Sequence, residues 1–272
     1  MTATRNPQIT PLLRSLTFVE VLVVFASGVG LFFIPESASA LWPWELLPFN
    51  ARFWGAVYSA SCISAVMQTV HGRWSPARLV TPMIFVFTAV IMALSFGYLS
   101  IFDFQRWEVW VWFALYIIIP FNCAYHLWLY RDLPPAETLP TSSNARAILL
   151  AQSILLGLFG FALLLAPAFA KQFWSWEIDV FHAQMYSVSF LTPAVGAFLL
   201  SKSASKTEWL TMGVTQAVLG LFPVLGVLIV DASIKRVDWL AASTWFWMII
   251  FTAIFAVAVW MIKESRTSIG GT

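Results

Sequence analysis

The sequence has few charged residues. Asp, Glu, Lys and Arg make up 10% of its 272 residues, whereas hydrophobic residues make up 60%. An ordinary soluble domain has about 25% charged and about 45–50% apolar residues. The shortage of charge therefore excludes a soluble fold. The formal net charge of +2 gives no reason to expect nucleic-acid binding.

The sequence also lacks the motifs of known catalytic sites. It contains no Gly-rich phosphate loop, no H-E-x-x-H and no G-x-S-x-G, which are the patterns of nucleotide, zinc and serine-hydrolase chemistry. Its two cysteines, Cys62 and Cys123, lie in apolar runs and do not form a C-x2-C pair. We expect them to be packing residues and not a disulfide or a metal site. These absences predict a non-enzymatic protein.

Long apolar runs are what the sequence has in abundance. Each run can cross a hydrocarbon core of about 30 Å as a helix with a rise of about 1.5 Å per residue. Their hydrophobicity is continuous, whereas the strands of a membrane barrel alternate. The eight runs lie at 13–34, 51–71, 79–101, 108–130, 147–168, 182–201, 209–230 and 239–262. The sequence therefore predicts an all-α integral membrane protein with eight transmembrane helices, whose first partner is the lipid bilayer.

The basic residues predict the orientation. If the N-terminus is cytoplasmic, ten of the 15 Lys and Arg residues lie on the cytoplasmic side and five lie outside. By the positive-inside rule, both termini are then cytoplasmic. We expect a multi-pass protein of the plasma (cytoplasmic) membrane of a bacterium.

One segment of the chain occurs twice. The stretch LWPWELLPFNARFWGA (41–56) resembles FWSWEIDVFHAQMYSV (173–188), 132 positions later. The offset pairs a W-x-W-E motif in each copy, which consists of Trp42, Trp44 and Glu45 in the first and of Trp174, Trp176 and Glu177 in the second. We infer two duplicated four-helix units. An even number of helices makes them parallel repeats, related by an axis along the membrane normal, because inverted repeats need odd-numbered units.

The duplication predicts how the chain is divided. The predicted parts are a cytoplasmic N-terminal tail (1–13), a first four-helix unit (14–130), a cytoplasmic linker (131–145), a second four-helix unit (146–263) and a cytoplasmic C-terminal tail (264–272). Residues 1–40 also resemble a secretory signal that ends in Ala38-Ser39-Ala40. We keep the first helix in the mature protein, because its counterpart lies in the middle of the chain.

The W-x-W-E motif predicts contacts at the membrane surface. Tryptophan prefers the headgroup region, and a carboxylate near the start of a helix is favoured by the helix dipole. We therefore interpret the motif as an anchor and a helix cap, with an external binding site as the alternative. The stretch WPWELLPFNARFWGA (42–56) also resembles a pattern of uncharacterised multi-pass bacterial membrane proteins, which implies membrane residence but no activity.

Several polar side chains fall inside the apolar runs, where an ionisable group costs roughly 2.5–3.5 kcal/mol. They gather in the cytoplasmic half of the predicted first unit, apart from one in the second. The predicted cluster consists of Glu20, Gln68, His71, Asn122, His126 and Gln152.

Three interpretations of this cluster remain open. The side chains could hydrogen-bond between helices, at about 0.6 kcal/mol each. They could instead line a path for a solute or for protons, centred on Glu20, with Asn122, His126 and Gln152 along it. His71 and His126 could also be the axial ligands of haem b.

Three functions follow from these interpretations. We favour an accessory or scaffold subunit of a membrane assembly, without a cofactor and with other membrane subunits as partners. The alternatives are a small-solute or proton-coupled transporter and a haem- or quinone-associated redox anchor.

Overall fold

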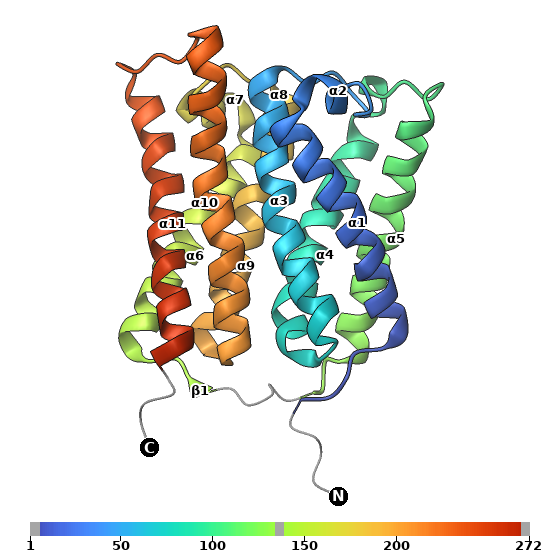
Figure 1. The fold of residues 1–272 in the computed structure, drawn as a ribbon, viewed down its shortest axis with the longest axis vertical. Coiled ribbons are helices and arrows are strands. Elements are labelled where there is room, and N and C mark those ends of the chain that lie inside the picture. The colour runs from blue at the N-terminus through green and yellow to red at the C-terminus, as the bar shows by residue number, and fades with distance from the viewer. Residues whose placement is uncertain (1–5, 134–138, 268–272) are drawn as a thin grey trace, which may run out of the picture.

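The structure, a computed structural model, describes residues 6–133 and 139–267, and the structural statements below refer to these residues. Long helices stand side by side as a bundle (Figure 1). They are α1 (Pro11–Phe33), α3 (Pro48–His71), α4 (Trp74–Gly97), α5 (Trp107–Leu129), α6 (Ser143–Leu165), α9 (Val188–Lys202), α10 (Lys206–Ile234) and α11 (Ala242–Thr267).

Short elements connect the long helices. They are α2 (Pro35–Ser39), the 3-10 turns η1 (Leu99–Ile101) and η2 (Lys171–Phe173), α7 (Pro167–Ala170) and α8 (Val180–Tyr186). Strands β1 (Leu139–Pro140) and β2 (Ser203–Ala204) pair antiparallel. The predicted tails and linker lie partly outside the described residues.

Seven of the described helical segments are long and apolar enough to cross a membrane. They are α1, α4, α5, α6, the segment Val180–Lys202 that contains α8 and α9, α10 and α11. These segments confirm the prediction of a multi-pass α-helical membrane protein. Helix α3 is 24 residues long but less apolar, and more than half of its residues are buried.

The helices begin and end at residues suited to those positions. The Thr10 hydroxyl accepts a hydrogen bond from the backbone N–H of Leu13 (3.1 Å) and caps α1. Ser205 and Glu208 form a capping box at the start of α10, in which side chains satisfy the free N–H groups of the first turn. Gly72 ends α3 with a φ of 58°, a left-handed conformation that glycine adopts without strain.

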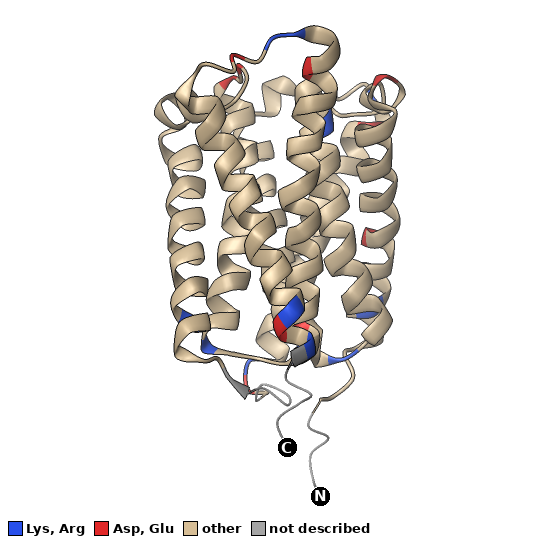
Figure 2. Ribbon diagram, turned by 60° about the vertical axis from the view of Figure 1, so that its left-hand side comes forward, with Lys and Arg blue, Asp and Glu red and all other residues tan. Residues whose placement is uncertain are grey.

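The bundle has two ends with different connections. We call the end where α1 starts, β1 pairs with β2 and α11 finishes the linker end; α2, α7 and α8 lie at the opposite end (Figure 1). Charged residues gather at these two ends, and few lie between them (Figure 2). This distribution fits an apolar belt around the middle of the bundle.

The helix contacts fall into three kinds of pair. Helix α1 packs on α3, as α6 packs on α9. Helix α4 packs on α5, as α10 packs on α11. The pairs α3 with α10 and α4 with α9 join the part before residue 131 to the part after it. The two parts therefore share one interior.

One predicted helix is interrupted. The run 182–201 forms α8 and α9, which meet at Ser187. The backbone N–H of Ser187 bonds to Gln184 O (3.1 Å), three residues back, so the helix tightens locally into a 3-10 turn. Helix α4 also ends at Gly97, four residues before the predicted limit of 101.

The tryptophans of the W-x-W-E motif were expected to contact the lipid headgroups, but they lie inside the protein. Trp42, Trp44, Trp174 and Trp176 are all buried, at 4–9% exposure. They pack edge to face on one another and on neighbouring rings, an arrangement that aromatic pairs prefer. Aromatic packing inside the protein therefore holds these indoles.

The carboxylates of the motif do not cap helices. Glu45 precedes α3, which has no acidic residue in its first turn and no side-chain cap. In the second copy the cap of α8 is Asp179, two residues after Glu177. Asp179 accepts from the backbone N–H of His182 (2.7 Å). A capping side chain must sit next to the first helical residue, and neither glutamate does.

Candidate functional site

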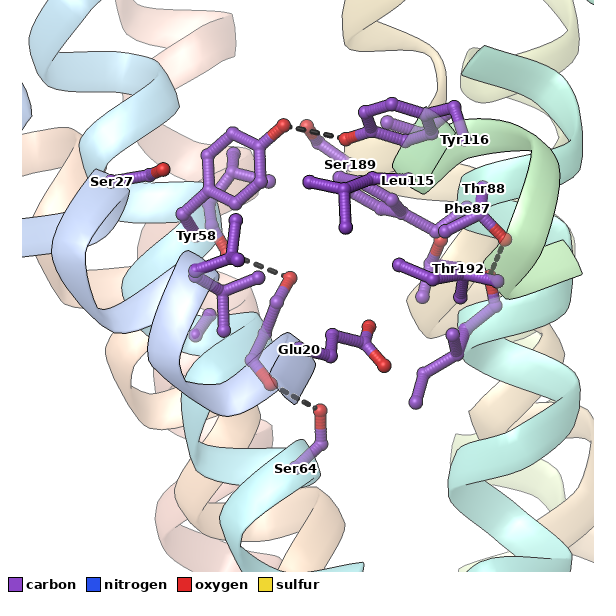
Figure 3. A pocket seen from close by; sticks show the side chains of 18 of the residues that line it. Glu20, Ser27, Tyr58, Ser64, Phe87, Thr88, Leu115, Tyr116, Ser189 and Thr192 are labelled. Carbon is purple, nitrogen blue, oxygen red and sulfur yellow. Dashed lines mark hydrogen bonds between the residues drawn. The ribbon is translucent and has the colours of Figure 1, made fainter. Parts of the chain in front are cut away.

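A cavity of about 190 Å³ lies among α1, α3, α4 and α5 and extends to α9 and α10. Its wall is largely apolar and aromatic, with Val24, Phe87 and Trp112 among the lining residues. The hydroxyl groups of Tyr58 and Tyr116 share a hydrogen bond of 2.6 Å at one side of it (Figure 3). A concave apolar wall with a few polar groups is typical of a small-molecule site.

Glu20 supplies the carboxylate of this cavity. Its side chain extends from α1 into the cavity (Figure 3) and is 9% exposed. In the described part of the chain, Glu20 has neither a hydrogen bond nor an ion pair, and the cavity lining contains no Lys, Arg or His. The only other carboxylate of the lining, Glu108, lies 3.4 Å from Arg106. A buried, unpaired carboxylate is costly, so Glu20 needs a proton or a cation.

Several other polar groups of the wall also lack a partner among the described residues. Buried polar atoms are normally hydrogen-bonded, so each of these would gain from a ligand in the cavity. They are Trp42 Nε1, Ser189 Oγ, Thr192 Oγ1, Thr215 Oγ1 and Gln216 Nε2. Four of the five lie on α9 and α10, whereas Glu20 lies on α1.

Gln152 meets the cavity only through a neighbour. Its Nε2 donates to Gln216 Oε1 at 2.8 Å, and Gln216 lines the cavity. Gln152 follows Glu20 by 132 positions. The amide therefore has the partner that the carboxylate lacks.

Gln68 connects three helices. Its amide nitrogen donates to Thr17 Oγ1 of α1 (2.8 Å), and its amide oxygen accepts from Thr81 Oγ1 of α4 (3.2 Å). The side chain is fully buried. Gln68 thus makes the interhelical hydrogen bonds that one interpretation of the polar cluster predicted.

The structure places Asn122, His126 and His71 away from the cavity lining. His126 is fully buried, with Nδ1 2.8 Å from Asn122 O and Nε2 2.6 Å from Thr10 Oγ1. His71 is exposed, and its Nδ1 lies 2.8 Å from Met67 O. Haem ligation by His126 would require the loss of one of its two contacts. No group of three or more His, Cys, Asp and Glu that could hold a metal occurs in residues 6–133 and 139–267.

A chain of polar contacts joins the two motif regions at the opposite end. Asp179 Oδ2 lies 2.9 Å from His182 Nδ1, and Trp44 Nε1 donates to His182 Nε2 (3.3 Å). Because Nε2 accepts, Nδ1 carries the ring proton and donates to Asp179. Partial burial raises the pKa of Asp179, but the hydrogen bonds from His182, together with the electrostatic attraction of His182 and Lys171, outweigh it, so the pKa lies below its usual value.

Sequence reasoning found Glu20 and missed most of the wall around it. Tyr58, Ser61 and Ser64 line the cavity from one face of α3. Their spacing of three residues is a signal that could have revealed this face. Ser189 and Thr215 gave no such signal, since only the packing of α9 and α10 on the first four long helices brings them to the cavity.

The chain resembles no known protein closely enough to take a function from it, so the function is inferred from the geometry. No family model, no curated protein and no solved structure matches the chain.

Proposed function

We propose that this protein is a multi-pass membrane transporter that binds a small organic cation at Glu20 and exchanges it for a proton. One observation carries the proposal: the Glu20 carboxylate extends into an internal cavity and has no partner among the described residues. Ionisable groups within membrane spans are typical of ion and proton paths.

The exchange follows from the cost of an unpaired buried charge. The carboxylate is neutralised either by a proton or by the positive charge of a bound ligand. The two compete for one group, so binding of the cation releases the proton. Gln216 and Ser189 on the facing helices supply polar groups that orient the ligand.

The contacts at the two ends of the bundle suit a cavity that is closed toward the linker end and open toward the opposite end. At the linker end, Arg78 of α4 forms an ion pair with Glu208 of α10 (2.8 Å), and Ser75 Oγ lies 2.6 Å from Ser205 Oγ. The cavity reaches toward the opposite end, where Trp107 is part of its lining. Alternating access would require the contacts at the linker end to open.

We further propose eight spanning helices, with α3 as the eighth, in two duplicated units. The equivalent helix contacts of the two parts support this arrangement. The Trp42–Trp44 and Trp174–Trp176 rings are both 5.4 Å apart. Ile34 and Ala166, 132 positions apart, end α1 and α6 with the same φ of −131°.

Close helix contacts repeat in the same way. Gly28 approaches Ser59, and Gly160 approaches Leu191. Both residues of the second contact follow those of the first by 132 positions. Together with the positive-inside pattern, the repeat supports the proposal of parallel units with both termini on the cytoplasmic side.

The test is proton release upon binding. The purified protein in a weakly buffered solution with a pH indicator is mixed with tetramethylammonium or with hexyltrimethylammonium. We expect the wild type to release protons with at least one of them and Glu20→Gln to release none. Glu45→Gln, which removes an exposed carboxylate, is the matched control and should release as the wild type does. A wild type that releases no protons with either cation contradicts the proposal.

A further inference from the structure

The cavity has an apolar rim. Leu41, Trp107 and Val111 line it and are 60%, 64% and 45% exposed. The one charged group of the lining at this level, Glu108, is paired with Arg106. A water-soluble ion would meet a hydrophobic opening here, whereas a molecule dissolved in the membrane would meet a surface like its own surroundings.

Helices α1 and α5 are held together at their ends. At the linker end, Thr10 contacts His126 (2.6 Å) and its N–H donates to the Tyr130 hydroxyl (2.7 Å). At the opposite end, Arg106 Nη2, just before α5, donates to Ala40 O (2.7 Å), which ends α2, the short helix that follows α1. No hydrogen bond between the described residues of α1 and α5 joins them at mid-height.

The middle of this α1–α5 seam is where the cavity wall reaches the surface. Val23 and Ser27 of α1 and Leu115 and Ile119 of α5 line the cavity, and all four are only half-buried. The neighbouring outward side chains are apolar and exposed, among them Leu22, Phe25, Ile117 and Ile118. In a bilayer, this seam would open toward lipid.

The second part of the chain fills the corresponding seam with rings. Phe159 of α6 packs on Phe246 of α11 (5.6 Å between centroids) and on Phe190 (4.8 Å). Phe159 follows Ser27 by 132 positions, and Phe246 follows Tyr116 by 130. The first seam thus carries a small hydroxyl side chain where the second carries a phenyl ring.

We infer that the ligand is an amphiphilic organic cation that enters sideways from the bilayer through the α1–α5 seam. Its positive group lies at Glu20, in the cavity that Tyr58 and Trp112 also line, and the face of an aromatic ring attracts cations. Its apolar part packs on Val24 and Phe87 of the wall. This inference rests on the proposed function and adds the class of substrate and its route.

Two matched cations test the class of substrate. Tetramethylammonium and hexyltrimethylammonium have nearly the same charged group and differ in one alkyl tail. Their binding to the wild-type protein in phosphatidylcholine nanodiscs is measured through the release of protons. The amount of each cation that dissolves in the lipid is subtracted from its total concentration. We expect the hexyl compound to bind at least tenfold more tightly, and equal affinities would overturn the inference.

A seam variant tests the route. In rapid mixing, Ser27→Phe should slow the proton release caused by the hexyl compound at least tenfold, because it places the ring of the second seam in the first. Ala26→Phe adds the same ring at the adjacent, exposed position and should leave the rate unchanged. If Ser27→Phe does not fold, Ser27→Leu replaces it.

The outcomes separate the two proposals. An unchanged rate in the folded seam variant overturns the lateral route. Equal affinity for the two cations overturns the amphiphilic substrate. In both cases Glu20-dependent proton release, and with it the proposed function, still stands. Absence of proton release from the wild type with both cations removes the proposed function and this inference with it.

Discussion

The Nε2 group of Gln152 donates a hydrogen bond of 2.8 Å to Oε1 of Gln216. Glu20 precedes Gln152 by 132 positions and has no equivalent partner among the described residues. The residue that precedes Gln216 by 132 positions is Ile84, which lines the cavity and offers no polar group to Glu20. Related positions thus contain a hydrogen-bonded amide pair in one part and, among the described residues, a carboxylate without a hydrogen bond in the other.

This contrast predicts that the carboxylate lowers stability. Glu20→Gln should raise the free energy of unfolding by about 1–3 kcal/mol, because an amide is neutral without having to take up a proton or a cation when it is buried. The measurement is thermal unfolding of the purified protein. Gln152→Glu is the matched reverse change and should lower the stability by a similar amount, since it removes the donor to Gln216. The argument would be contradicted if Glu20→Gln and Gln152→Glu changed the stability by equal amounts in the same direction.

The sequence predicted the membrane class, the approximate spans and a carboxylate within the first span, because hydropathy and the cost of a charge in lipid depend on single segments. It did not predict the cavity. Ser189 and Gln216 reach the cavity through the packing of α9 and α10 against the first four long helices, which no local pattern encodes. The burial of Trp42 and Trp44 was missed for the same reason, since a tryptophan near a helix end suits either a headgroup or an aromatic core.

The lowered pKa of Asp179 predicts that the folded protein loses stability at acid pH. Its pKa in the folded protein lies below its usual value of 3.8. The stability that it contributes is therefore complete above the usual value and is lost as the pH falls through the lowered one. The apparent unfolding temperature should fall in this acid range, and Asp179→Asn, which can still cap α8, should reduce the fall. Glu177→Gln, an exposed neighbour, should leave the profile unchanged; an identical profile for Asp179→Asn would refute the prediction.

The ion pair between Arg78 and Glu208 is a second source of stability. Arg78 donates to both carboxylate oxygens (3.0 and 2.8 Å), and the Glu208 side chain is fully buried. Arg78→Met should cost about 3–5 kcal/mol, because it leaves a buried carboxylate uncompensated. Adding Glu208→Gln should restore most of this loss, since Gln keeps the capping box without the charge. Denaturation of the single and double variants measures the difference, and a double variant as unstable as Arg78→Met would show that charge is not the cause.

The close contact of α1 with α3 predicts a graded response to added methyl groups. A Cβ at Gly28 would lie 2.8 Å from the backbone nitrogen of Ser59, whereas a Cβ at Gly160 would first meet the side chain of Leu191, also at 2.8 Å. Backbone cannot yield as a leucine rotamer can, so Gly28→Ala should cost about 1–3 kcal/mol, the usual range for overpacking, and Gly160→Ala should cost less. Gly97→Ala is the control, because no atom lies within 4 Å of its added carbon. Thermal unfolding of the three variants should rank Gly28→Ala as the least stable and Gly97→Ala as the most. A Gly28→Ala protein as stable as the control would mean that α1 can move away from α3 at little cost, and the wall that carries Glu20 would then be less rigid than its packing implies.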